Sequence, residues 1–275
     1  MTPYAIGFVL LLVIAGLVGG PLFAAYRRRK ARDMPFPAAW REIIDRRVPL
    51  ARNLPPSLRL QLEARIQVFL LEKNFIGCDD VAITDEMRIT IAAQACLLVL
   101  NRKSTPYPNL RQILVYPGAF LVDRIRPEPS GILQEERRAL SGESWTQGQV
   151  VLSWEDTLND AAIADDGRNV VIHEFAHQLD QEKGYANGAP WLGNRDRYPS
   201  WSQVLAYEFA MLQQAAFTGQ PSLLNHYGAT NPAEFFAVAT EVFFEQPQAM
   251  AHMHPALYAE FANLYRVDPA QWPRS

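Results

Sequence analysis

The sequence predicts an α+β fold that is mainly helical and contains a small mixed or antiparallel sheet. Helical periodicity recurs along the chain, whereas a few short runs of β-branched and aromatic residues bounded by glycine or proline are typical of strands. With 275 residues, of which 49% are hydrophobic, the chain is long enough to bury a core in one domain or in one domain plus an appendage.

The first residues predict a membrane anchor. No charged residue occurs between Thr2 and Tyr26, so residues 3–26 are long and apolar enough to cross a lipid bilayer as a helix. Five basic residues follow between positions 27 and 32, and the positive-inside rule then puts the N-terminus outside and the remainder in the cytoplasm. We therefore expect a single-pass protein of the inner (cytoplasmic) membrane, with residues 1–33 as anchor and basic stop.

A linker and an irregular lead-in with one small helix are expected over residues 34–56, which contain five prolines. The compact domain is predicted over residues 57–275. Its first helices are expected at Leu58–Phe75 and Asp85–Asn101, and Thr84-Asp85 provides a cap for the second.

The strands are expected after these helices and before the remaining ones. They are Ile113–Tyr116 with Ala119–Val122, and then Gln149–Trp154. A further helix begins near Asp165-Asp166 and ends before Gly184, whose missing Cβ suits a C-terminal cap. The last helices are expected at Trp201–Phe217, Asn231–Glu245 and Pro255–Tyr265.

Composition excludes several classes of function. The net charge is −3 and there is no basic stripe, so we expect no direct binding of nucleic acid. Cys78 and Cys96 lie in apolar, helix-like surroundings, and a disulfide-stapled secreted domain would contain more cysteines. Both are expected to be reduced thiols.

The segment His173-Glu174-Phe175-Ala176-His177 predicts a catalytic zinc site. Positions i and i+4 share one face of a helix, so the two imidazoles can bind one Zn²⁺ per chain while Glu174 acts as general base on water. The alternative is a pair of hydrogen-bonded core histidines. The apolar residues around the motif indicate a buried helix, in which two histidines and a glutamate are costly without a metal or partners.

The third ligand must come from another segment. A histidine on the same segment would require Gly at 180 and His at 183, and these positions are Asp180 and Lys183. We therefore expect a glutamate from a later helix, as in His₂Glu sites, and Glu234 is the candidate. The alternative is that Glu234 forms a capping box with Asn231 and only satisfies a backbone N–H.

Three further residues are candidates for supporting roles. Glu241 lies about 10 Å along the helix from Glu234, too far to share the metal, and is expected to be a buried hydrogen-bonding partner. Asp180, one turn beyond His177, either orients a ligand imidazole or ends the helix. Tyr227 either donates to the oxyanion of a tetrahedral intermediate or is a packed loop tyrosine.

Residues 173–180, followed by Tyr227 to Phe236, closely resemble the Mlc titration factor A family of zinc-dependent peptidases. Residues 115–120 and 141–154 are also similar to that family, and the resemblance covers roughly Trp40 to Trp272. A more distant resemblance is to the catalytic domain of anthrax lethal factor. The family implies zinc ligands at His173, His177 and Glu234, a base at Glu174 and a transition-state tyrosine at Tyr227.

The resemblance implies a zincin-type domain with its cleft between the His173 and Glu234 helices, and aminopeptidase-type activity on short peptides. A peptide substrate could pair with an edge strand such as Gln149–Trp154. The alternative is a membrane-tethered binding protein that sequesters a DNA-binding transcriptional repressor, with a structural zinc site. Glu174 favours the enzyme, because a structural site needs no base.

Overall fold

The computed structural model describes residues 19–273, except 103–106, 128–132, 141 and 146–147. Four strands form a sheet in the order β1, β2, β6, β5. β1 (Asn74–Gly77), β2 (Gln112–Tyr116) and β6 (Gln149–Ser153) are parallel, and β5 (Gly142–Trp145) pairs antiparallel with β6. The predicted small mixed sheet in a mainly helical protein is confirmed.

The order of the strands corrects one expectation. The predicted edge strand Gln149–Trp154 is β6, which lies between β2 and β5 and has no free edge in the described sheet. Its last predicted residue, Trp154, begins α6 (Trp154–Ala162), because the Ser153 side chain accepts a hydrogen bond from the Asp156 N–H and caps a helix there. The outer strand on that side is β5.

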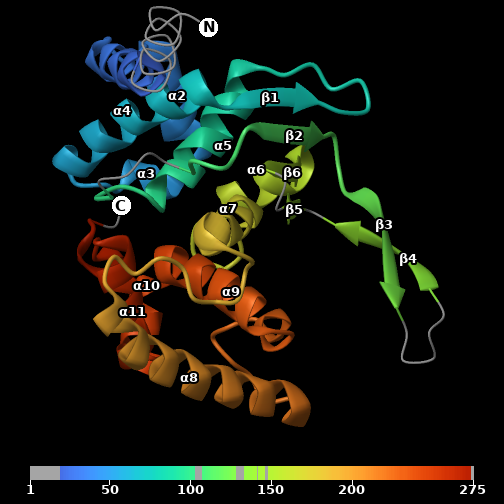
Figure 1. Cartoon of the computed structure of the whole chain (residues 1–275). Helices are drawn as coiled ribbons and strands as arrows, with labels where there is room; N and C mark the ends of the chain where they lie inside the picture. Colours follow the sequence, from blue (N-terminus) through green and yellow to red (C-terminus); the bar gives the residue numbers. More distant parts are fainter. Residues whose placement is uncertain (1–18, 103–106, 128–132, 141, 146–147, 274–275) are drawn as a thin grey trace, which may run out of the picture.

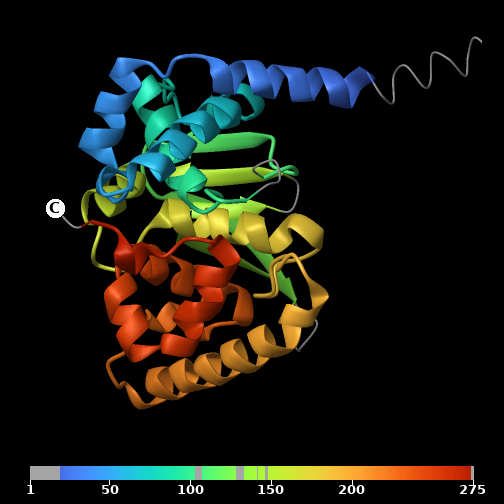
Figure 2. The same cartoon turned by 90° about the vertical axis from the view of Figure 1, so that its left-hand side faces the viewer.

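The elements stack in layers on either side of this sheet (Figure 2). The N-terminal helices lie on one side of the sheet, α7 (Val170–Asp180) lies on the other, and the C-terminal helices lie beyond α7. β3 (Phe120–Pro127) and β4 (Leu133–Leu140) form a separate antiparallel pair, which projects from the body (Figure 1).

The segment predicted as linker and lead-in packs into the core. α2 (Ala38–Arg47) and α3 (Pro49–Arg52) both contact α5 (Asp85–Leu97), and Ile44 is fully buried. Two helices are present here, where one was expected. The domain boundary at residue 57 stays a prediction, and these contacts favour an earlier start.

The prediction of a membrane-spanning N-terminal helix is wrong for the residues that the structure describes. Among them, no helix is long and apolar enough to cross a membrane. Helical residues 19–33 include the whole basic cluster, and Arg28 pairs with Glu72 of α4 (Pro56–Glu72). This overturns the expectation of a single-pass inner-membrane protein held in the bilayer by residues 3–26, although positions 3–18 of that segment lie outside the described residues.

The C-terminal helices supply most of the buried aromatic side chains of the core. They are α8 (Tyr198–Thr218), α9 (Pro232–Glu245), α10 (Pro247–Met253) and α11 (Pro255–Tyr265). Phe243 of α9 is fully buried and its ring lies 5.5 Å from that of Tyr265 and 5.9 Å from that of Phe261, measured between centroids. Short 3-10 turns complete this half: η1 (Gln181–Lys183), η2 (Arg195–Arg197), η3 (His226–Ala229) and η4 (Pro269–Gln271).

The aromatic cluster predicts a large effect of truncation. Phe243→Ala should lower the free energy of unfolding by about 3–5 kcal/mol, because it removes buried contacts and leaves a cavity. Phe217→Ala on α8, where the side chain is 93% exposed, is the control and should change it by less than about 0.5 kcal/mol. Urea titrations of both variants measure the difference, and equal values would contradict this account of the core.

Candidate metal centre and active-site cleft

α7 begins at Val170, four to five residues later than predicted. The Asn169 side chain accepts a hydrogen bond from the Ile172 N–H at 3.0 Å and so caps the helix. Gly167, at φ 77°, takes the left-handed conformation that keeps the preceding residues out of the helix. Asp165 and Asp166 therefore belong to the turn before α7. The helix ends at Asp180, and η1 continues the chain to Lys183.

His173, His177 and Glu234 lie together between α7 and α9. One ligand atom of each lies within 4.8 Å of the others. Glu234 Oε2 is 3.0 Å from His173 Nε2 and 3.3 Å from His177 Nε2. The two imidazole rings, one helical turn apart, have their centroids 4.9 Å apart. The i, i+4 spacing thus presents both nitrogens to one carboxylate.

The Asn231 side chain caps α9 without help from Glu234. Its oxygen accepts from the N–H groups of Ala233 and Glu234, at 2.9 and 3.0 Å. The Glu234 carboxylate is directed at the histidines, which favours a ligand over a capping box. Burial raises its pKa, but the hydrogen bonds to His173 and His177 outweigh burial and hold the pKa well below the usual range.

Glu241 is buried, and its hydrogen-bond partner in the cluster is His173. Its Oε1 is 2.7 Å from His173 Nδ1, and its Oε2 accepts from the Asn169 N–H at 2.6 Å. A carboxylate on Nδ1 favours the tautomer with the proton on that nitrogen, which leaves the Nε2 lone pair directed at the cluster. Burial alone lowers the pKa of His173, but the Glu241 and Glu234 carboxylates raise it well above its ordinary value.

Glu174 lies beside the cluster, and β5 comes very close to it. A Cβ added to Gly142 would lie 2.7 Å from Glu174 Cγ and Oε1, and 2.8 Å from Val170 Cγ2. Position 142 must therefore be glycine for the outer strand to approach α7 at this distance. On the same strand, Ser144 Oγ accepts a hydrogen bond from Gln178 Nε2 of α7 at 2.7 Å.

Two adjoining cavities open on either side of these residues. One has a volume of about 420 Å³ and the other about 470 Å³, and Gly142, His173, Glu174 and Tyr227 line both. Tyr227, at the start of η3, is 48% exposed and its ring centroid is 6.0 Å from that of His173. The structure thus places Tyr227 in the cleft rather than in a packed loop.

Asp180 is the last residue of α7. Its Oδ2 accepts from the N–H groups of Asn187 and Gly188, both at 2.7 Å, which anchors the following loop. Its Oδ1 and His177 Nδ1 are buried, and neither has a hydrogen-bond partner among the described residues. These hydrogen bonds hold the loop after α7, and both expected roles of Asp180 stay predictions.

Two residues of the site were not expected from the sequence. Asn169 caps α7 and bonds Glu241, and Gly142 admits Glu174. Asn169 lies one residue before the apolar run, which is a signal for a cap. Gly142 stands in the Ser-Gly-Glu-Ser segment already noted for its resemblance, but only the packing of β5 on α7 explains it.

The site combines a buried helix that carries two histidines, a carboxylate from a second helix and a cleft on both sides. This combination is typical of metallopeptidases. Residues 23–266 match the family described as glucose-regulated metallo-peptidase M90, and the chain belongs to this family.

Similarity to individual proteins supports this family membership. An uncharacterized protein of Synechocystis sp. is 44% identical over 271 residues, which are 98% of each chain. Mlc titration factor A of Salmonella arizonae is 33% identical over 245 residues, which cover 88% of this chain and 96% of the relative. The protein of the same name in Salmonella agona is 33% identical over 227 residues, which cover 82% and 84%. The resemblance to the Mlc titration factor A family is confirmed.

The close approach of β5 to α7 predicts that Gly142→Ala reduces activity. The added methyl group must displace Glu174 or β5, and a displacement of about 1 Å at a reacting group can cost on the order of 10²-fold in rate. Gly184→Ala is the control, because nothing lies within 4 Å of a Cβ at that position. We expect kcat on a chromogenic peptide to fall only in Gly142→Ala, and equal rates would contradict the assignment.

Glu245 predicts a dependence of stability on pH. Its carboxylate accepts from Asn169 Nδ2 and the Arg168 N–H, and burial raises its pKa from 4.5 to about 9 against these bonds. Between pH 4.5 and about pH 9, the Glu245 carboxyl is therefore protonated in the folded protein and ionised in the unfolded chain, so folding takes up a proton. The free energy of unfolding should fall as pH rises through this window, by up to about 1.4 kcal/mol per pH unit.

Glu245→Gln removes this titration. Urea titrations in EDTA, at about pH 6 and about pH 8, should show a smaller loss of stability with rising pH in the variant than in the parent. Parallel pH dependences would show that Glu245 is ionised in the folded protein.

Proposed function

We propose that this chain is a zinc-dependent peptidase of aminopeptidase type with a zincin-type domain. The observation that carries the proposal is the cluster of His173, His177 and Glu234 with Glu174 beside it in the cleft. Membership of a metallopeptidase family supports a peptidase-like function. Zinc, the aminopeptidase preference and the roles of the individual residues are our inference.

The donor set fits zinc. Two imidazole nitrogens and one carboxylate oxygen are the ligands of His₂Glu catalytic sites, which keep a fourth position open. The Glu241 bond on His173 Nδ1 is the second interaction that such a ligand requires. We propose His173, His177 and Glu234 as the ligands of one Zn²⁺ per chain. A zinc ion bound there supplies a Lewis acid that lowers the pKa of water and polarises the scissile carbonyl.

The residues around the cluster suit peptide hydrolysis. Glu174 would take the proton from the attacking water and pass it to the leaving amine, and its burial at 5% exposure limits competing solvent. Tyr227, which lines both cavities, would donate to the developing oxyanion. β5 is the last strand of the described sheet, and its outer edge would pair with an extended peptide.

The acidic cavity supports the aminopeptidase preference. Asp156 and Asp160 line the cavity of about 420 Å³ together with His173 and Glu174. Asp156 Oδ2 is buried and has no hydrogen-bond partner among the described residues. A substrate ammonium group in this cavity would offset the cost of burying that carboxylate, and its scissile bond would then lie near Glu174.

A second candidate function is the binding of a DNA-binding transcriptional repressor. The name of the Salmonella relatives says that they titrate Mlc. On α8, Tyr207, Met211 and Phe217 are 64%, 50% and 93% exposed, and apolar side chains exposed along one helix can mark a protein interface. This surface does not include the cleft, so the two functions can be tested separately.

Metal analysis tests the ligand assignment. The purified chain should contain about one Zn²⁺, and Glu234→Ala should lower the zinc content. Glu241→Gln should weaken zinc affinity by about 10- to 100-fold, because it loses the carboxylate partner of His173. Glu42→Ala, at an exposed position on α2, is the control. Full zinc content in Glu234→Ala would leave that residue without the proposed role.

Kinetics separate the base from the ligands. Glu174→Gln should keep the metal and the fold while kcat on amino-acid and peptide substrates falls by about 10²–10⁴-fold, because proton transfer is lost. Tyr227→Phe should lower kcat by on the order of 10²–10³-fold, with zinc retained.

Undiminished hydrolysis by Glu174→Gln would refute the proposed mechanism. If neither parent nor variant hydrolyses any substrate while both bind a purified repressor, and Phe217→Ser weakens that binding, the second candidate function is correct.

A further inference from the structure

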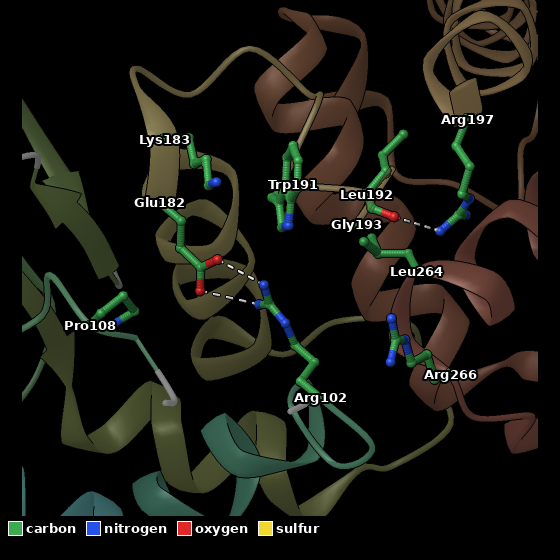
Figure 3. Close-up of a pocket in the computed structure, with 10 residues that line it drawn as sticks. All are labelled: Arg102, Pro108, Glu182, Lys183, Trp191, Leu192, Gly193, Arg197, Leu264 and Arg266. Carbon is green, nitrogen blue, oxygen red and sulfur yellow. Dashed lines mark hydrogen bonds and ion pairs between the residues drawn. The ribbon is translucent and has the colours of Figure 1, made fainter. Parts of the chain in front are cut away.

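A third cavity, of about 390 Å³, lies away from the metal cluster (Figure 3). Its lining comes from η1, the loop after it, the end of η2, the end of α11 and the segment that carries Arg102 and Pro108. Four of its ten lining residues are cationic and only Glu182 is acidic. In Figure 3, Arg102 and Arg266 reach toward this space from one side, and Trp191 faces them from the other.

Two of the four cations are compensated by the protein. Arg102 donates two hydrogen bonds to Glu182, at 2.7 and 3.1 Å. Arg197 donates to the Leu192 carbonyl at 3.1 Å and lies 3.5 Å from a carboxylate oxygen of Glu260. These contacts fix the Arg102 and Arg197 side chains and largely neutralise their positive charges.

No carboxylate of the described residues pairs with Lys183 or Arg266. Lys183 Nζ lies 3.9 Å from the Trp191 ring centroid, a cation–π contact that holds the ammonium group at the cavity. The Arg266 side chain makes no hydrogen bond or ion pair with the described residues, whereas its carbonyl accepts from Asn101 Nδ2 at 2.7 Å. Its backbone is fixed in the left-handed region, at φ 57°, where it ends α11. Among the described residues, two positive charges at the cavity are therefore not paired with a carboxylate.

We infer that this cavity binds a small organic phosphate. A phosphate monoester carries close to two negative charges at neutral pH and three acceptor oxygens, which match one guanidinium and one ammonium group. The volume lies within the range of small-molecule sites and is larger than phosphate alone requires. Pro108, Leu192 and Leu264 supply apolar walls for the organic part.

The cavity borders η1, which continues the helix that carries His173 and His177. η1 follows α7 without a break, and its residues Glu182 and Lys183 line the cavity. A ligand there would touch the chain six residues beyond His177. The inference depends on the charges, the volume and the apolar walls of this cavity, and it stands whether or not the chain is a peptidase.

Calorimetric titration of the full chain with phenyl phosphate tests the inference. EDTA in the buffer excludes binding to a metal. Dissociation should occur in the micromolar to low millimolar range and should weaken with salt, because the contacts are ionic. Benzoate, with a single charge, and inorganic phosphate, without an organic part, should each bind at least about tenfold more weakly.

Variants locate the binding. Arg266→Asn, which suits a left-handed backbone, and Lys183→Gln should each weaken phenyl phosphate binding by about ten- to a hundredfold. Glu182→Gln removes the only carboxylate of the cavity and should tighten binding several-fold, an effect that misfolding cannot produce. Arg52→Gln, an exposed cation of α3 outside the cavity, should bind like the parent.

Absence of measurable binding by the parent would overturn the inference. Equal affinity in Arg266→Asn, Lys183→Gln and Arg52→Gln would place the phosphate elsewhere on the protein and overturn it as well. Inorganic phosphate bound as tightly as phenyl phosphate would contradict an organic ligand.

Discussion

The carboxylate of Glu241 joins the two helices on which the site depends. One oxygen accepts from the N–H of Asn169, which caps α7, and the other bonds His173 Nδ1. The same side chain of α9 thus fixes where α7 begins and how its first histidine is turned. Because Glu241 is only 7% exposed, these bonds form in a low-dielectric environment where they are stronger than in water.

The other contacts around α7 follow from this arrangement. Glu245, one turn beyond Glu241, bonds Asn169 and the Arg168 N–H, and Asp160 accepts from the Val170 N–H at 2.8 Å. The N–H groups at the start of a helix have no intrahelical partners, and Asp160 supplies a partner for that of Val170. On the opposite side, glycine at position 142 lets β5 approach Glu174. The cleft is therefore bordered by α7, which acidic side chains hold, by the outer strand of the sheet and by α9.

Both ends of α7 matter to the chemistry of this chain. Its first turns carry the histidines, and its continuation in η1 borders the cationic cavity. Between them, Asp180 holds the backbone of Asn187 and Gly188. A single rigid helix, buried along all residues but His173, therefore spans the two places where small charged groups would bind.

The sequence determined the local features. The His-Glu-x-x-His spacing, the Thr84 and Asn231 caps and the range Pro255–Tyr265 depend on residues within one or two turns of each other, and the structure has them as expected. Glu234 was chosen because His₂Glu sites take their third ligand from a later helix, and the pitch of that helix excluded Glu241 as a ligand and made it a buried hydrogen-bonding partner. The relative positions of residues along one helix depend only on their spacing, which the sequence already shows.

Only the tertiary structure decided the features that depend on distant segments. The place of β6 inside the sheet depends on its pairing with β2 and β5, and strand order is not encoded in the strand itself. The role of Gly142 depends on a helix about thirty residues away, the start of α7 on carboxylates of α9, and the cationic cavity on five separate segments. The membrane span was inferred from an uncharged run and the basic cluster after it, whereas the described helix at 19–33 contains that cluster and pairs with α4. Contacts between distant segments select one arrangement where local sequence patterns are compatible with several.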